Sequence, residues 1–158
     1  MDFGYSSDPT AIVAIYYYNG GYILDEIVFR KGLSNRQIAD ILLNKDNALT
    51  IADSAEPKSI DEIAEYGISI IGSEKGQGSV SQGIQLVQDQ RISVTKRSIN
   101  IIKEYRNYLW EVDKDGNVLG KPEHQFSHSM DAIRYGMQTL REFIIEEDEE
   151  FNLYPDVE

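Results

Sequence analysis

An antiparallel hairpin followed by a β-α-β unit is the feature of this sequence that most constrains its fold. Residues 10–18 and 22–29 are rich in β-branched and aromatic side chains, and the Asn-Gly-Gly segment at 19–21 is a tight-turn signal between them. Residues 48–71 then form a short apolar strand, a helix opened by a proline, and a second short strand. Because β-α-β units favour parallel pairing, the sequence predicts an α/β fold with a mixed β-sheet flanked by helices.

The rest of the chain supplies further helices and short strands. No internal repeat or linker interrupts them, so we predict one domain over residues 1–145 and an acidic, flexible tail over 146–158. The other expected elements are a helix capped by Ser34, a helix at 79–88, a strand at 91–95, a helix at 98–106, a short hairpin at 108–118 and a final helix from near Ser127 to about Ile145.

The composition is that of an ordinary soluble globular domain. Of the 158 residues, 41% are hydrophobic and 27% are charged, which separates the chain from disordered proteins. The absence of cysteine excludes disulfides, thiolate metal ligands and thiol catalysis. No apolar run approaches the roughly 20 residues that span a bilayer, and no signal-peptide pattern is present. We therefore expect a cytosolic protein with no membrane partner.

The net charge of −12 is unevenly distributed along the chain. Seven of the 27 acidic residues lie in 146–158, and without that segment the net charge is −5. Residues 75–106 contain six basic residues and two acidic ones. This strip is either a solvated surface or part of a phosphate-binding groove. In the second case Lys75, Lys96 and Arg97 are the candidates for contacts with nucleic acid.

Three aspartates stand at the boundaries of expected elements. Asp2 precedes the hairpin, Asp53 directly follows the strand that begins the β-α-β unit, and Asp131 opens the final helix three residues after His128. Three carboxylates around one point could not all stay ionised without bound cations. The sequence therefore predicts a divalent-metal site, where two hard cations would clamp the attacking and leaving oxygens of a phosphodiester.

Each of these residues also has a simpler interpretation. Asp2 and Asp8 could be turn formers whose carboxylates accept hydrogen bonds from nearby backbone N–H groups. Asp53 could interact with the dipole of the following helix, although ligands of parallel sheets gather where the strands end. His128 and Asp131 share one helix face, and the pair is harder to explain by structure alone. His128 would orient or deprotonate a water molecule, or bind a softer ion such as manganese.

Four segments in a fixed order carry a family resemblance. They are Asp2-Phe-Gly-Tyr-Ser-Ser-Asp8-Pro-Thr-Ala, Ile51-Ala-Asp53-Ser-Ala-Glu56-Pro-Lys-Ser-Ile, Lys75-Gly-Gln-Gly-Ser79-Val and His128-Ser-Met-Asp131-Ala-Ile-Arg-Tyr. Together they resemble the C-terminal nuclease domain of tailed-bacteriophage terminase large subunits, over nearly the whole chain up to about residue 145. The resemblance implies a ribonuclease H-like fold.

The resemblance also implies a function and assigns roles to residues. Asp2, Asp53 and Asp131 correspond to the catalytic metal-binding acids, His128 to the family's histidine, and Asp8 to a further candidate ligand. With two Mg²⁺ or Mn²⁺ ions, such a domain would cut concatemeric viral DNA during genome packaging by two-metal hydrolysis. Its partners would be double-stranded DNA, a packaging ATPase domain, the portal and the small terminase subunit. The location would be the cytoplasm of the infected host cell.

Two departures from the family and several rival functions qualify this prediction. The sequence has no Gly-x-x-x-x-Gly-Lys-Ser/Thr loop, so we expect no ATPase activity from this chain. Asp2 follows only Met1, so the first strand of the fold should be short.

The alternatives are another ribonuclease H-like nuclease, acting on DNA junctions or RNA–DNA hybrids, and a non-catalytic interaction module of the same fold. An actin-like ATPase would need a longer chain.

Overall fold

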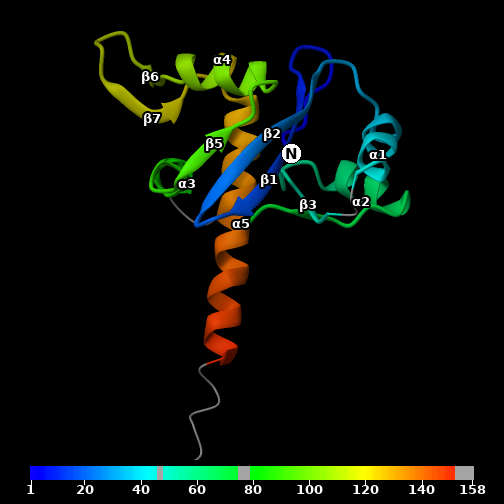
Figure 1. Ribbon diagram of the computed structural model, residues 1–158. Helices are drawn as coiled ribbons and strands as arrows, with labels where there is room; N and C mark the ends of the chain where they lie inside the picture. Colours follow the sequence, from blue (N-terminus) through cyan, green and yellow to red (C-terminus); the bar gives the residue numbers. More distant parts are fainter. Residues whose placement is uncertain (46–47, 75–78, 152–158) are drawn as a thin grey trace, which may run out of the picture.

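The computed structural model describes residues 1–45, 48–74 and 79–151, with Ser79 and residues 142–151 described by their backbone alone. In chain order the elements are β1 (Thr10–Tyr18), β2 (Gly21–Arg30), α1 (Asn35–Leu43), β3 (Thr50–Ala52), α2 (Pro57–Glu65), β4 (Ile70–Gly72), α3 (Ser79–Gln88), β5 (Ile92–Val94), α4 (Ile99–Asn107), β6 (Trp110–Val112), β7 (Val118–Pro122), the 3₁₀ helix η1 (His124–Phe126) and α5 (His128–Phe151). Helix α5 runs behind β1 and β2, while α1 and α2 lie together at one side (Figure 1).

The first two strands form the predicted hairpin. They pair antiparallel from Thr10 opposite Arg30 to Tyr18 opposite Gly21. The φ angles of Asn19 (49°) and of the following glycine (72°) are both positive, as a type I′ turn requires. Strand β5 pairs parallel with β2, so the sheet β1-β2-β5 is mixed, as predicted.

The predicted β-α-β unit is also confirmed. Strands β3 and β4 pair parallel, with α2 between them in the chain and Pro57 in its first turn. The neighbouring helix α1 is capped by Ser34, which forms a capping box with Gln37. These elements enclose an apolar cluster that we call the first core. Its buried members are Met1, Ile12, Leu33, Ile38, Ala39, Ala52, Ile63 and Ile70.

The first two residues join the two sheets. The Met1 nitrogen donates to the Ile51 carbonyl at 2.5 Å, and the Asp53 N–H donates to the Met1 carbonyl at 3.1 Å, which is a parallel pairing with β3. Asp2 exchanges two hydrogen bonds with Ala11 of β1, at 2.9 and 3.0 Å, as an antiparallel bridge. Residues 1–2 therefore connect β3 of one sheet to β1 of the other. Beside this link, a cavity of about 360 Å³ with mainly apolar lining lies between β1 and β3.

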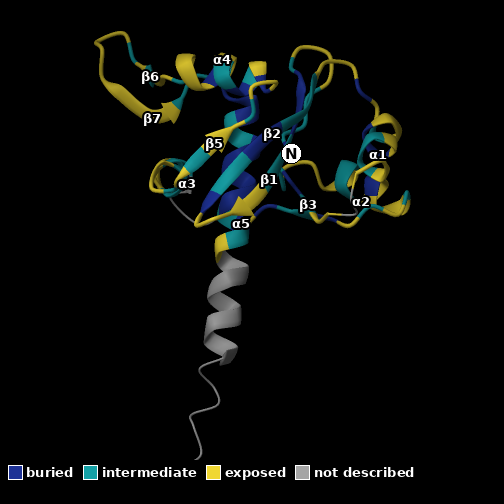
Figure 2. Ribbon diagram, in the orientation of Figure 1, coloured by how far each residue is buried: buried dark blue, intermediate teal, exposed yellow. Residues whose placement is uncertain are grey.

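Helix α5 packs against β1, β3, α3 and α4. A second core lies on this side of the molecule, and its buried members are Leu24, Ile101, Ile133 and Met137. Gly136 lets the helix approach β1 closely, since a Cβ there would lie 2.7 Å from Cδ1 of Ile15. Figure 2 shows the buried part of α5 behind the strands and the exposed β6–β7 hairpin at the edge.

The end of α5 differs from the sequence prediction. The helix continues to Phe151, beyond the expected end near Ile145, so residues 146–151 of the predicted tail are helical. The physical reason is that Glu, which is frequent there, is a good helix former. The remaining tail at 152–158 lies outside the described residues, and its flexibility stays a prediction. In the described part of the chain, no helix combines the length and apolar character needed to cross a membrane.

Candidate metal centre

Each of the three predicted aspartates is held by local backbone structure. Asp2 lies in the link between the sheets. Asp53 directly follows β3, and its Oδ1 accepts the Ala55 N–H at 3.0 Å. Asp131 lies in the first turn of α5. The bond to Ala55 gives Asp53 a local turn-forming role, whereas the simpler interpretation of Asp53 from the sequence was an interaction with the dipole of the following helix. This bond is compatible with ligand binding because a carboxylate has about four acceptor positions.

The charges of the three carboxylates raise the pKa of one buried phenol, that of Tyr135. Tyr135, one turn after Asp131 on α5, is buried. Burial is the main cause that raises the pKa of Tyr135, and the charges of Asp131, Asp53 and Asp2 raise it further. Burial also raises the pKa of Asp2, and the charge of Asp131 contributes to that increase. The charges of the three acids therefore share one effect, which is to raise the pKa of Tyr135.

His128 contacts the first of these acids. Its Nδ1 lies 3.2 Å from Oδ2 of Asp2, and the two side chains are only 6% and 13% exposed. This hydrogen bond raises the pKa of His128, against the opposing effect of burial. When Asp2 is ionised, it only accepts hydrogen bonds, so Nδ1 then carries the proton and Nε2 of a neutral His128 retains its lone pair.

Asp8 lies on the other side of the His128 ring. Its Oδ1 is 3.7 Å from His128 Nε2, and its Oδ2 is 3.4 Å from His124 Nε2. The two imidazole rings meet edge to face with centroids 4.9 Å apart. The sequence analysis missed His124, although its spacing of four residues from His128 was a usable signal.

Two buried charged residues hold the beginning of α5. Glu104 of α4 accepts hydrogen bonds from the backbone N–H of Ser129, at 2.6 Å, and from its hydroxyl. Arg134 donates to Asp131 Oδ1 at 2.8 Å and stacks over the Tyr135 ring at 4.7 Å. The sequence analysis missed both residues. For Arg134 the i, i+3 spacing from Asp131 was available as a signal, whereas Glu104 had none.

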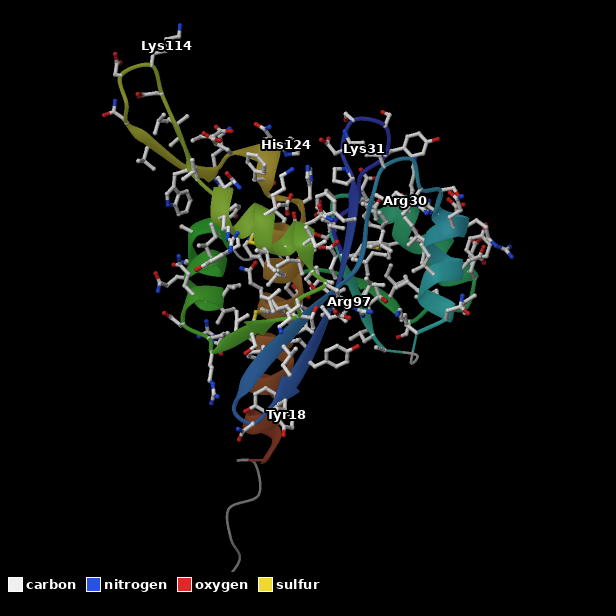
Figure 3. All side chains as sticks on the ribbon, turned by 45° about the horizontal axis from the view of Figure 1, so that its top comes forward. Tyr18, Arg30, Lys31, Arg97, Lys114 and His124 are labelled. Carbon is white, nitrogen blue, oxygen red and sulfur yellow. The ribbon has the colours of Figure 1, made fainter. Side chains whose placement is uncertain are left out.

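The basic residues are arranged differently from the sequence expectation. Arg97 forms an ion pair with the buried Asp25, and its Nε donates to Oδ1 at 2.7 Å. Lys96 is exposed in the turn between β5 and α4, and Lys75 lies outside the described residues. A cavity of about 420 Å³ beside His128 is lined by other basic residues. They are Arg30 and Lys31, which the sequence did not indicate, and Lys103, which belongs to the basic strip 75–106 but was not among the named candidates for nucleic-acid contacts. Figure 3 shows Arg30, Lys31 and His124 at one end of the molecule.

This arrangement suits a divalent-metal site in a ribonuclease H-like domain. The oxygen-rich donor set of Asp2, Asp53 and Asp131 fits hard cations such as Mg²⁺ and Mn²⁺. The model of the terminase RNAseH-like domain family matches residues 2–139, and the chain therefore belongs to this family.

Two relatives in sequence are terminase large subunits. The terminase large subunit of Bacillus phage SPP1 is 36% identical over 146 residues, which cover 87% of this chain and 35% of the relative. The PBSX phage terminase large subunit of Bacillus subtilis (strain 168) is 29% identical over 149 residues, covering 87% of this chain and 33% of that protein. The chain thus spans about a third of the length of these relatives.

Solved structures agree with this assignment. The nuclease domain of the SPP1 large terminase, determined with bound Mn, has a TM-score of 0.75 and 34% sequence identity, covering 89% of this chain and 83% of that chain. The P22 large terminase nuclease domain has a TM-score of 0.67 at 19% identity, covering 89% and 78%, and supports the fold alone. The predicted resemblance and the predicted ribonuclease H-like fold are confirmed.

Proposed function

We propose that this chain is the nuclease part of a phage terminase large subunit and that it cuts concatemeric viral DNA by divalent-metal-dependent phosphodiester hydrolysis. The observation that carries the proposal is the contact between Asp2 and His128, at 3.2 Å, together with the hydrogen bond that joins Asp53 to the Met1 carbonyl beside Asp2. The SPP1 nuclease domain, 34% identical and determined with bound Mn, supports a divalent metal in this family.

The three aspartates would hold two Mg²⁺ or Mn²⁺ ions. Asp2 lies in the link between the two sheets and would hold the ions together with Asp53 and Asp131. Burial, which raises the pKa of Asp2, makes its ionised form costly without a cation nearby. When bound, the ions would supply positive charge that stabilises the attacking and leaving oxygens of the phosphodiester.

His128 would accept a proton at this site. Its Nδ1–H is directed at Asp2, which fixes the ring and leaves Nε2 as the basic atom. A water molecule at Nε2 could transfer a proton to it during attack on phosphorus. Asp131 would be kept in position by its ion pair with Arg134.

The cavity beside His128 would receive the DNA backbone. Arg30, Lys31 and Lys103 line it together with Asp8 and His128. Lysine and arginine side chains next to a metal centre can bind phosphates without reading the base sequence, so we expect low sequence specificity. The Lys103→Ala variant should bind duplex DNA more weakly, with the slope of log Kd against log salt reduced by about 1. Lys58→Ala, an exposed change on α2, is the control.

The partners of this domain are inferred from what its relatives are. Because they are terminase large subunits, we propose that this domain works beside a packaging ATPase domain, a portal and a small terminase subunit. The site of action would be the cytoplasm of an infected host cell, and the substrate would be double-stranded DNA.

The decisive experiment is nicking of supercoiled plasmid by the purified chain in Mn²⁺. Asp53→Asn should lower the rate by at least about 100-fold, as removal of one transition-state-stabilising group does. The exposed Asp61→Asn on α2 should not change it, and chelation by EDTA should abolish it. Full activity of Asp53→Asn would refute the assigned site. Preferential cleavage of four-way junctions or RNA–DNA hybrids would favour the other ribonuclease H-like activities instead.

A further inference from the structure

A second group of ligand-type side chains lies next to the carboxylate site but differs from it in chemistry. It consists of Asp8, from the loop before β1, His124 of η1 and His128 of α5. We propose that these three side chains form a separate transition-metal site, which binds Zn²⁺ through two imidazoles and one carboxylate and leaves one coordination position open.

The distances between the ligand atoms suit such an ion. One ligand atom from each side chain lies within 4.8 Å of the other two. Ligands of a tetrahedral zinc ion, with bonds of about 2.0–2.2 Å, lie about 3.3–3.6 Å apart. The two oxygens of Asp8 are already near this distance from the imidazoles, with Oδ2 at 3.4 Å from His124 Nε2 and Oδ1 at 3.7 Å from His128 Nε2, so a small rotation of the carboxylate would let one oxygen face both rings. The His124 side chain is 72% exposed, so it has room for the small rotation that would close the third separation.

The orientation of His128 favours a metal at Nε2. Its Nδ1 is hydrogen-bonded to Asp2, and its Nε2 is directed toward Asp8. Histidine ligands of metals almost always donate their other ring N–H to a carboxylate, a carbonyl or water, which fixes the tautomer and increases the basicity of the ligand. Asp2 provides this second contact, and it is only 13% exposed, so the ring orientation is set before any metal binds.

The donor set predicts a different metal preference from that of the three aspartates. Imidazole nitrogen suits Zn²⁺, Ni²⁺ and Cu²⁺, whereas Mg²⁺ prefers oxygen ligands. Three protein ligands with one open position are the arrangement of zinc sites that are accessible to solvent molecules. Millimolar Mg²⁺ should therefore leave this site to Zn²⁺.

Zinc at this position would restrain the proposed nuclease, and this consequence depends on the proposed function. The ion would occupy Nε2 of His128, the atom proposed to accept a proton from water. It would also lie at the edge of the cavity lined by Lys103 and Arg30. Low concentrations of Zn²⁺ should thus inhibit nicking in Mg²⁺, and the His124→Ala variant should be less sensitive.

The test measures metal binding directly. Zn²⁺ is titrated calorimetrically into the purified chain in excess Mg²⁺, and Co²⁺ is used as a probe whose visible absorption reports four-coordinate binding. The wild-type chain should bind one equivalent. His124→Ala should weaken binding by at least about 10-fold, and Asp8→Asn should do the same. Gln125→Ala, a neighbouring change in η1, is the matched control and should bind like the wild type.

The variant Asp53→Asn separates this proposal from the proposed function. It should lose nicking but keep the one equivalent of Zn²⁺, because Asp53 is not among the three ligands. Unchanged Zn²⁺ affinity in both His124→Ala and Asp8→Asn would overturn the site. Loss of Zn²⁺ binding in Asp53→Asn would also overturn it, since the ion would then belong to the carboxylate site. Circular dichroism checks that the variants are folded.

Discussion

The two cores of the molecule are stabilised by different kinds of interaction. The first core, around β3, α1 and α2, is a cluster of apolar side chains. The second core, around β2, α4 and α5, is smaller and is accompanied by buried ionisable side chains. These are Asp25, Glu104, His128 and Arg134. The candidate site takes residues from both sides, so its geometry depends on apolar packing on one side and on charge pairing on the other.

The largest effect should come from the apolar side. Ile63 is fully buried in the first core, and Ile63→Ala should lower the free energy of unfolding by about 2–5 kcal/mol through lost transfer energy and a residual cavity. Urea unfolding followed by circular dichroism measures this. Ile99→Ala, at a side chain that is 69% exposed, is the control. Because the loss is apolar, it should be the same at neutral and mildly acidic pH, and a strong pH dependence would remove the contrast between the cores.

A smaller but still large effect should come from the buried acid that fixes α5. Glu104→Ala leaves the Ser129 N–H without its acceptor, and we expect a loss of about 1–3 kcal/mol. Glu104→Gln keeps an acceptor oxygen and should cost less. The exposed Glu65→Ala on α2 is the control for removal of one negative charge. Equal losses in Glu104→Ala and Glu65→Ala would mean that Glu104 does not hold the helix.

The Asp25–Arg97 pair should make the second core sensitive to acid. The hydrogen bond from Arg97 is the main cause that holds the pKa of Asp25 below its ordinary value. The pair therefore contributes stability above the unfolded pKa of about 3.9, and this contribution is lost as the pH falls through the lower pKa of the folded protein. Asp25→Asn should cost about 1–2 kcal/mol at neutral pH.

The difference between wild type and Asp25→Asn, measured by urea unfolding across the acidic range, should shrink toward zero as Asp25 becomes protonated. A difference that stays constant down to the acid limit would show that the loss comes from altered packing. In that case the charge pair would not explain the stability of this region.

The smallest effect should come from an ion pair on the surface of the first core's helices. Arg36 and Asp40 of α1 form an i, i+4 pair at 3.1 Å, with side chains 65% and 53% exposed. Water and salt screen such pairs, so Asp40→Ala should change the unfolding free energy by about 0.5 kcal/mol or less. A loss as large as that of Asp25→Asn would show that burial does not distinguish the two pairs.

Local patterns made much of the fold predictable. The Asn19-Gly20 turn, the capping serine of α1 and the proline that opens α2 each act within a few residues, and all three are found as expected. The three aspartates were proposed as site residues from the sequence because each stands where an element begins or ends, and their role as metal ligands stays a prediction.

The contacts that the sequence did not indicate are between distant segments. Glu104 and Ser129 meet only because α4 packs on α5. The pairing of Arg97 with Asp25 joins the segment after β5 to β2, and no spacing rule relates these positions. Likewise, Arg30 and Lys31 come beside Lys103 only in three dimensions, so the charge count along residues 75–106 included Lys103 but not the other two.

The link formed by Met1 and Asp2 gives the protein two internal reporters of how the site is assembled. The amide hydrogens of Ala11 and Asp53 are both bonded to carbonyls of this dipeptide, at 3.0 and 3.1 Å. Their exchange with deuterium should be slow only while both sheets are joined to it. If a bound cation pulls the three carboxylates together, protection of these two amides should increase, whereas amides in the distant β6–β7 hairpin should exchange as before.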